Sequence, residues 1–291
     1  MFDITGARCR AYEKHRGKKG GARRDLEDLR AAINHHAEEG LHRAIVNVQL
    51  PEKGEPRDRW LTRDEAAKLL WVCWRAREQQ RRKRAFGKRA HKLAKQLPTA
   101  KHTLRHLARF ILIGLYTGSR ATPIACASFH AAAGRSYIDL AQGMFYRRPE
   151  GARITKKRQP PVPIPDRLLA HMRRWKRKGI ADQYAVEWHG EPVKSVKTAM
   201  KSAVAKAQLP GKISPHTLRH TAATWLMQAG TDMWQAAGYL GMSLEMLERV
   251  YGHHHPDYMS EATAKIGAKP KRPNGSPMKR VNQTATRRIE A

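Results

Sequence analysis

Four residues of this chain have side chains suited to chemistry on an anion, namely Arg120, His216, Arg219 and Tyr251. His216 and Arg219 are three residues apart, so on a helix their imidazole and guanidinium groups would share one side and could meet one anionic group. This spacing also occurs by chance in a basic protein, with the histidine in the core and the arginine on the surface. The pair gains meaning only from the residues around it.

Those residues form an ordered set. The set comprises Thr-Gly-Ser-Arg ending at Arg120, a basic stretch with Lys156, His-Thr-Leu-Arg-His starting at His216, Leu240-Gly241-Met242, and Tyr251 nine residues after Met242. In order and spacing it resembles the catalytic domain of the tyrosine recombinases, the phage integrase family, over residues 61–266. The joint pattern carries the resemblance, because each motif alone is short.

The resemblance implies a role for each residue. Arg120 and Arg219 would clamp the non-bridging oxygens of the scissile phosphate, and Tyr251 would attack phosphorus. His216 would act as an acid, base or hydrogen-bonding group, and Lys156 would protonate the leaving 5′-oxygen.

The chemistry itself asks for these residue types. Two guanidiniums can neutralise the extra charge of a pentacoordinate phosphorane-like transition state without a metal. A free tyrosine, with a pKa of ~10, needs a positive neighbourhood to become a nucleophile. A 3′-phosphotyrosine conserves the energy of the phosphodiester bond, so we expect neither a cofactor nor a metal, and the sequence has no Walker loop or carboxylate cluster.

Each assignment has an alternative. Arg120 could merely cap the carbonyls of a helix end. Tyr251 could be an ordinary packing residue with Tyr258 as the nucleophile, although the spacing from Leu240-Gly241 favours Tyr251. Lys157 could take the place of Lys156, or both could be solvated residues of a hairpin turn.

The chain departs from the family pattern at two places. Where the family usually has histidine or tryptophan after Leu-Gly, this chain has Met242, whose thioether cannot donate a hydrogen bond to phosphate. We expect a slower site or a substitute donor such as His253. Three consecutive histidines, 253–255, point in different directions, which disfavours a metal site. At the front, residues 2–44 resemble only half of the usual core-binding domain, as in a truncated reading frame or a variant with a reduced DNA clamp.

Hydrophobic periodicity predicts that helices position the set. We expect helices at 25–39, 104–116, 168–178, 193–207, 217–228, 233–240 and 244–251, and a further one opened by the capping box of Thr62 and Glu65. Short β-prone stretches at 136–139, 144–146, 153–155 and 162–164 predict a small antiparallel sheet, whose last hairpin carries Lys156. The fold class is therefore mainly α with a small antiparallel β-sheet (α+β).

Prolines and glycines predict the domain boundaries. Pro51, Gly54 and Pro56 indicate a linker, so residues 1–56 form a partial helical core-binding segment with its linker. Residues 57–266 form the catalytic domain. Residues 267–291 have no apolar period and read as a basic disordered tail.

The net charge predicts double-stranded DNA as the partner. The chain has 57 Lys and Arg against 25 Asp and Glu, a net charge of +32, and eleven of the basic residues lie between Arg75 and Lys101. An anionic membrane would also attract this charge, but the sequence has no apolar run long enough to cross a bilayer and no signal peptide. We therefore expect a cytoplasmic, nucleoid-associated protein. Its three scattered cysteines predict neither a disulfide framework nor a thiolate zinc site.

The leading hypothesis is a site-specific DNA recombinase that integrates or excises a phage or other mobile element. By resemblance it would act as a homotetramer on DNA, with its C-terminal segment docked on a neighbour and with an accessory DNA-bending protein as a further partner. The alternatives are a type IB topoisomerase-like enzyme and a catalytically weakened DNA-binding remnant. An RNA-binding protein would explain the charge but not the ordered set.

Overall fold

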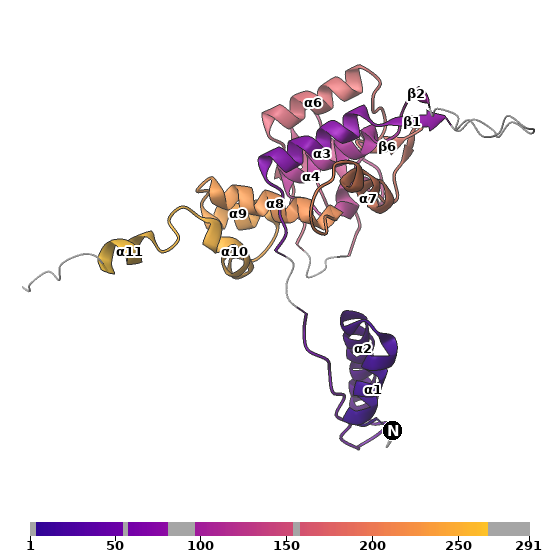
Figure 1. Cartoon of the computed structure of the whole chain (residues 1–291), viewed down its shortest axis with the longest axis vertical. Helices are drawn as coiled ribbons and strands as arrows, with labels where there is room; N and C mark the ends of the chain where they lie inside the picture. Colours follow the sequence, from indigo (N-terminus) through magenta and orange to yellow (C-terminus); the bar gives the residue numbers. More distant parts are fainter. Residues whose placement is uncertain (1–3, 55–57, 81–96, 154–157, 267–291) are drawn as a thin grey trace, which may run out of the picture. The chain divides into compact units, whose positions relative to one another are not determined.

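The structure is a computed structural model that describes residues 4–54, 58–80, 97–153 and 158–266 (Figure 1). The chain forms two compact units, Met1–Asp58 and Arg59–Ala291. Among the described residues, none of the helices combines the length and the apolar character needed to cross a bilayer.

The smaller unit is a pair of helices, α1 (Gly6–Arg16) and α2 (Lys19–Glu38), that pack against each other around Cys9, Leu26 and Ile33. The helix predicted at 25–39 is the second part of α2. Helix α2 begins six residues before the predicted start, at Lys19. Helix α1 gave no periodic signal, since Cys9 is its one buried residue.

The body of the larger unit is built on α4 (Arg105–Thr117), which contacts α3 (Arg63–Arg75), α6 (Asp166–Arg177) and α8 (Pro215–Gln228) (Figure 1). Phe110, Ile111 and Ile113 of α4 are fully buried in the core that these helices share. The predicted capping box at the start of α3 is present, with Thr62 accepting from the Glu65 N–H and Glu65 accepting from the Thr62 N–H. Helix α7 (Lys197–Lys206) packs on α3.

Among the described residues of the larger unit, three small antiparallel sheets are present. They are β1 (Arg77–Gln80) with β2 (Leu97–His102), β3 (Tyr137–Asp139) with β4 (Met144–Tyr146) and β5 (Val162–Pro163), and β6 (Glu187–Trp188) with β7 (Glu191–Pro192). The expected mainly α fold with small antiparallel sheets is confirmed. No strand forms at Arg153, and the rest of the stretch predicted at 153–155 lies outside the described residues.

The C-terminal helices lie on α8. Helices α9 (Met233–Leu240) and α10 (Leu244–Tyr251) pack on it through a cluster that includes Met227, Leu240, Leu247 and Tyr251. The short 3-10 helix η1 (Gly252–His254) and α11 (Ser260–Ile266) follow, and α11 buries none of its side chains. Short α5 (Ala121–Ala125) begins directly after Arg120.

Gly118 is the residue that turns the chain from α4 toward Arg120. Its φ of +59° is the left-handed conformation typical of a glycine C-cap, and a Cβ here would lie 2.2 Å from Leu240 Cδ2. Only glycine permits both the turn and this close approach to α9.

Candidate active site

Arg219 is held between the ends of two helices. It is 5% exposed, and its Nη1 donates to the carbonyl oxygens of Gly118 (2.9 Å) and Leu240 (2.6 Å). The helix that carries it starts with Ser214 as N-cap and Pro215 at its first position, an arrangement that fits the fixed φ of proline. Burial lowers the pKa of Arg219 to about 10, so the guanidinium stays charged at pH 7.

Arg120 lies close to Arg219. It is half-buried at the N-cap of α5, and its Nη1 donates to the carbonyl of Arg158 at 2.6 Å. Burial lowers its pKa, and its charge contributes to the lowered pKa of Arg219. The partner of Arg120 is a carbonyl on the segment that leads into β5, and not the end of a helix.

Arg147 is a third arginine at this place, and the sequence analysis did not identify it. It follows β4, is 2% exposed, and bridges two segments, with Nε donating to Pro160 O and Nη2 to Tyr239 O, both at 2.8 Å. Burial, with the charges of Arg219 and Arg120, lowers its pKa to about 10. A signal was available, because two-residue periodicity after buried Phe145 directs Arg147 inward.

We call Arg120, Arg147 and Arg219 the arginine cluster. Within the described ranges, no carboxylate forms an ion pair with any of the three, and no acidic side chain contributes to their lowered pKa values. Burying like charges without a counter-ion costs free energy. The cluster is therefore a site in which a bound anion would relieve the repulsion.

Tyr251 ends α10 with its ring in the α8–α10 cluster and its hydroxyl on His220. It is 7% exposed, and its Oη lies 2.7 Å from His220 Nδ1. The charge of an ionised Tyr251 would raise the pKa of Arg219, so the phenol is within electrostatic range of the arginine cluster. His220 is a second residue of the site that the sequence analysis did not select, although it follows Arg219 directly.

The other predicted residues are placed as follows. His216 is exposed at the start of α8, and its ring meets that of His220 edge-on at 4.6 Å between centroids. Lys156 and Lys157 lie outside the described residues. Tyr258, the rival to Tyr251, is 49% exposed. His253 is exposed on η1 and packs against His254.

A pocket of about 680 Å³ adjoins the cluster. Its lining includes Arg147, Arg158, Gly241 and Met242. The Met242 side chain is half-buried there, at the position where the sequence departs from the family pattern. The wall of this pocket is therefore basic and offers no donor at residue 242.

We expect Gly241→Ala to destabilise the fold more than Gly134→Ala. Both glycines have positive φ, +67° and +72°, but a Cβ at 241 would lie 2.8 Å from Pro160 Cδ and 2.9 Å from Arg158 O, whereas nothing lies within 4 Å of a Cβ at 134. The strained backbone alone costs about 1–2 kcal/mol, and the steric clash adds to it at Gly241. Denaturant unfolding would measure the difference, and equal losses would contradict the close packing at Gly241.

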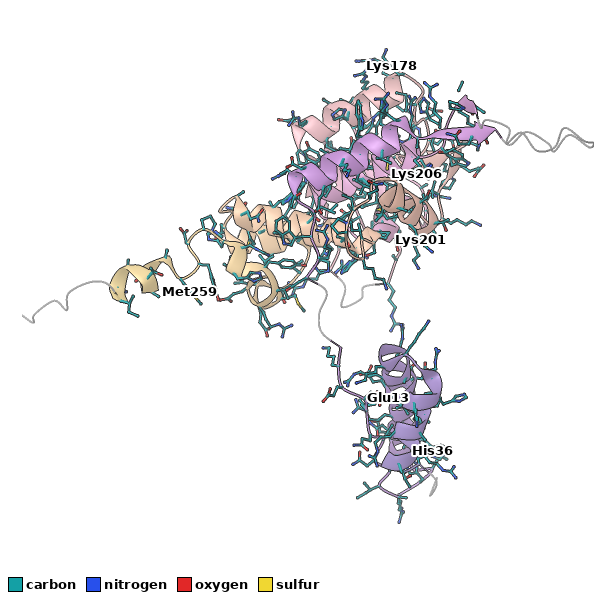
Figure 2. All side chains as sticks on the ribbon, viewed as in Figure 1. Glu13, His36, Lys178, Lys201, Lys206 and Met259 are labelled. Atoms are coloured by element: carbon teal, nitrogen blue, oxygen red, sulfur yellow. The ribbon has the colours of Figure 1, made fainter. Side chains whose placement is uncertain are left out.

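We also expect millimolar inorganic phosphate to raise the melting temperature of the protein through the arginine cluster. In Arg147→Met the phosphate-induced shift should fall by at least about a third, because one of three positive charges is removed. Lys201→Met, an exposed change on α7 (Figure 2), is the matched control. With ionic strength balanced by chloride, an unchanged shift in Arg147→Met would exclude Arg147 from the anion site.

The comparisons with known proteins agree with this geometry. Residues 134–257 match the model of the phage integrase family. The tyrosine recombinase XerC of Listeria monocytogenes is 33% identical over 89 residues, covering 26% of this chain and 30% of XerC. XerD of Corynebacterium glutamicum is 34% identical over 86 residues, covering 29% of this chain and 28% of XerD. The chain thus matches about a third of the length of these relatives.

Solved structures show the same fold. The Tn1549 transposon integrase in complex with transposon right end DNA has a TM-score of 0.60 at 18% identity, covering 88% of this chain and 82% of the integrase. A lambda integrase dimer bound to a COC′ core site has a TM-score of 0.60 at 16% identity, covering 86% and 80%. Residues 134–257 of the chain are therefore similar to the phage integrase, or tyrosine recombinase, family, whose members break and rejoin DNA.

Proposed function

We propose that this chain is a site-specific DNA recombinase that cleaves and rejoins DNA through a 3′-phosphotyrosine at Tyr251. The observation that carries the proposal is the arginine cluster, whose buried and half-buried arginines have no carboxylate partner in the described parts of the chain and lie within electrostatic range of Tyr251. A phosphodiester supplies the anion that the cluster lacks. A neighbouring tyrosine supplies a nucleophile.

The proposed roles follow from this geometry. Arg120 and Arg219 would hold the non-bridging oxygens and stabilise the charge of the transition state. Tyr251 Oη would form a bond to phosphorus while the bond from phosphorus to the 5′-oxygen breaks, and a 5′-hydroxyl would later reverse the step. His216 lies at the exposed edge of the site, where it could donate a hydrogen bond to phosphate, and Lys156 remains the proposed acid for the 5′-oxygen.

The setting of the reaction is part of the proposal. The net charge of +32 supports double-stranded DNA as the partner and a cytoplasmic, nucleoid-associated location. We propose a homotetramer on DNA, an accessory DNA-bending protein, and integration or excision of a phage or other mobile element. The similarity to integrases of a phage and of a transposon supports the last point.

One observation favours a second candidate, a weakened DNA-binding remnant. Met242 lines the pocket beside the arginine cluster and cannot donate a hydrogen bond to phosphate. A remnant would retain salt-sensitive DNA binding without strand cleavage. The topoisomerase alternative would relax supercoiled plasmid without strand exchange.

A covalent trapping experiment separates these functions. Duplexes that the protein selects from a randomised pool would be rebuilt as nicked suicide substrates and analysed on denaturing gels. A denaturation-resistant protein–DNA adduct supports the recombinase. Retained binding with no adduct would favour the remnant and overturn the proposed activity.

A further inference from the structure

The Tyr251 hydroxyl forms a hydrogen bond with His220. The Oη to Nδ1 distance of 2.7 Å is a hydrogen bond, and the two residues come from different helices, α10 and α8. His216, the histidine that the family pattern selects, is exposed, and its ring contacts the ring of His220. The two histidines therefore differ in position, because His220 is hydrogen-bonded to the phenol and His216 is exposed at the start of α8.

Packing does not require this contact. The ring of Tyr251 and the side chains of Leu247, Leu240 and Met227 already hold α10 on α8. A phenylalanine at 251 would fill the same space. The Tyr251 hydroxyl and the His220 imidazole add a polar contact to this apolar packing. The contact involves the tyrosine whose charge acts on Arg219, the residue at which the phosphate would bind.

We propose that His220 is a catalytic residue, whose Nδ1 accepts the proton of Tyr251 as the phenol attacks phosphorus. This inference rests on the proposed function. The proton moves from Oη to Nδ1, the oxygen electron pair forms the bond to phosphorus, the bond to the 5′-oxygen breaks, and a separate acid protonates that oxygen. Rejoining reverses each transfer, with His220 returning the proton to the departing tyrosine.

The tautomer needed is neutral imidazole with its proton on Nε2, which leaves Nδ1 as the acceptor. The ionisable groups recorded around this pair are His216 on the same helix, Tyr251 on α10, and Arg219, whose charge acts on Tyr251. Arg219 is cationic, and His216 is cationic when protonated, so an imidazolium formed at His220 adds a further positive charge to the site. The phosphate held by the arginine cluster would balance that charge. Cleavage should therefore require neutral His220 before the step.

The contact can be tested first in the free protein. Fluorotyrosine incorporated at the eight tyrosines gives signals in the fluorine spectrum, and the loss of one in Tyr251→Phe assigns Tyr251. His220→Ala should shift that signal. His220→Asn, whose amide lies near the Nδ1 position, should restore it toward the wild-type value. If the Tyr251 signal does not shift in His220→Ala, the proposal is overturned.

Adduct formation then separates catalysis from anchoring. In His220→Asn we expect adduct formation to be roughly 100-fold slower, with an unchanged melting temperature, because the amide can hold the phenol but cannot take its proton. Added imidazole should speed up His220→Ala. An anchoring role alone predicts a wild-type rate in His220→Asn and no effect of imidazole.

The pH profile supplies a further readout. As the pH is lowered and the imidazole becomes protonated, the wild-type rate should fall by up to roughly tenfold per pH unit, and His220→Asn should lose this dependence. His216→Asn is measured alongside to separate any contribution of that ring, and His171→Ala, exposed on α6, is the control. If the wild type itself forms no adduct, the proposed function and the role of His220 fail together. A normal rate in His220→Asn removes the role of His220 alone.

Discussion

Tyr251→Phe is expected to abolish the covalent protein–DNA adduct while leaving DNA binding nearly unchanged. The substitution removes one hydroxyl and no charge, and the phenyl ring keeps its place in the cluster with Leu247. Loss of a covalent nucleophile should lower the rate by roughly 10⁴-fold or more. Stability should fall by only about 1 kcal/mol, the usual loss for one hydrogen bond. Denaturing gels measure the adduct, and mobility shifts over a salt series measure binding.

Tyr258→Phe is the matched control for this experiment. Tyr258 is 49% exposed and lies seven residues further along the chain, so the same hydroxyl is removed outside the arginine cluster. Its adduct should form at the wild-type rate. An adduct that survives in Tyr251→Phe and is lost in Tyr258→Phe would transfer the role of nucleophile to Tyr258.

The helices could be predicted because their packing leaves a strong period in the sequence. The bounds predicted for α9 and α10 are those observed, and α8 differs only by starting at Pro215, where the Ser214 cap places it. Helix α7 starts four residues later than predicted, because the N–H of Val193 donates to Val186 O outside the helix. The stretches predicted at 136–139, 144–146 and 162–164 contain β3, β4 and β5, whereas the two-residue strands β6 and β7 are too short to show alternation.

The site was predictable only where a local motif marks it. Arg120, Arg219 and Tyr251 belong to short segments with recognisable neighbours. The roles of Arg147 and His220 depend on contacts between distant segments, since Arg147 binds a carbonyl 92 residues away and His220 meets Tyr251 31 residues away. Such contacts between distant residues depend on how α8, α9 and α10 pack against one another. That packing cannot be predicted from a single sequence.

Arg219→Ala should impair strand cleavage far more than it weakens DNA binding. Arg219 is one positive charge among 57 Lys and Arg, so its loss should lower the slope of log K against log salt by at most about one. Catalysis depends instead on its geometry. The hydrogen bonds from Nη1 to Gly118 O and Leu240 O fix one end of the guanidinium, which limits the directions in which its remaining N–H groups can point. Removing a preorganised donor of this kind costs about 10²–10³ in rate.

Arg219→Lys separates charge from geometry, because lysine keeps the positive charge but cannot reproduce the planar fork of donors. We expect its salt dependence to match the wild type while its adduct rate stays at least tenfold low. Lys201→Ala, an exposed loss of one charge on α7, should show the opposite pattern, a wild-type rate with a salt slope lowered by at most about one. Single-turnover adduct rates at saturating protein measure the catalytic loss, and DNA binding over a salt series measures the slope. Melting curves establish that each variant is folded. A rate loss in Arg219→Ala no larger than its binding loss would make Arg219 a structural link between α4 and α9 rather than a phosphate ligand.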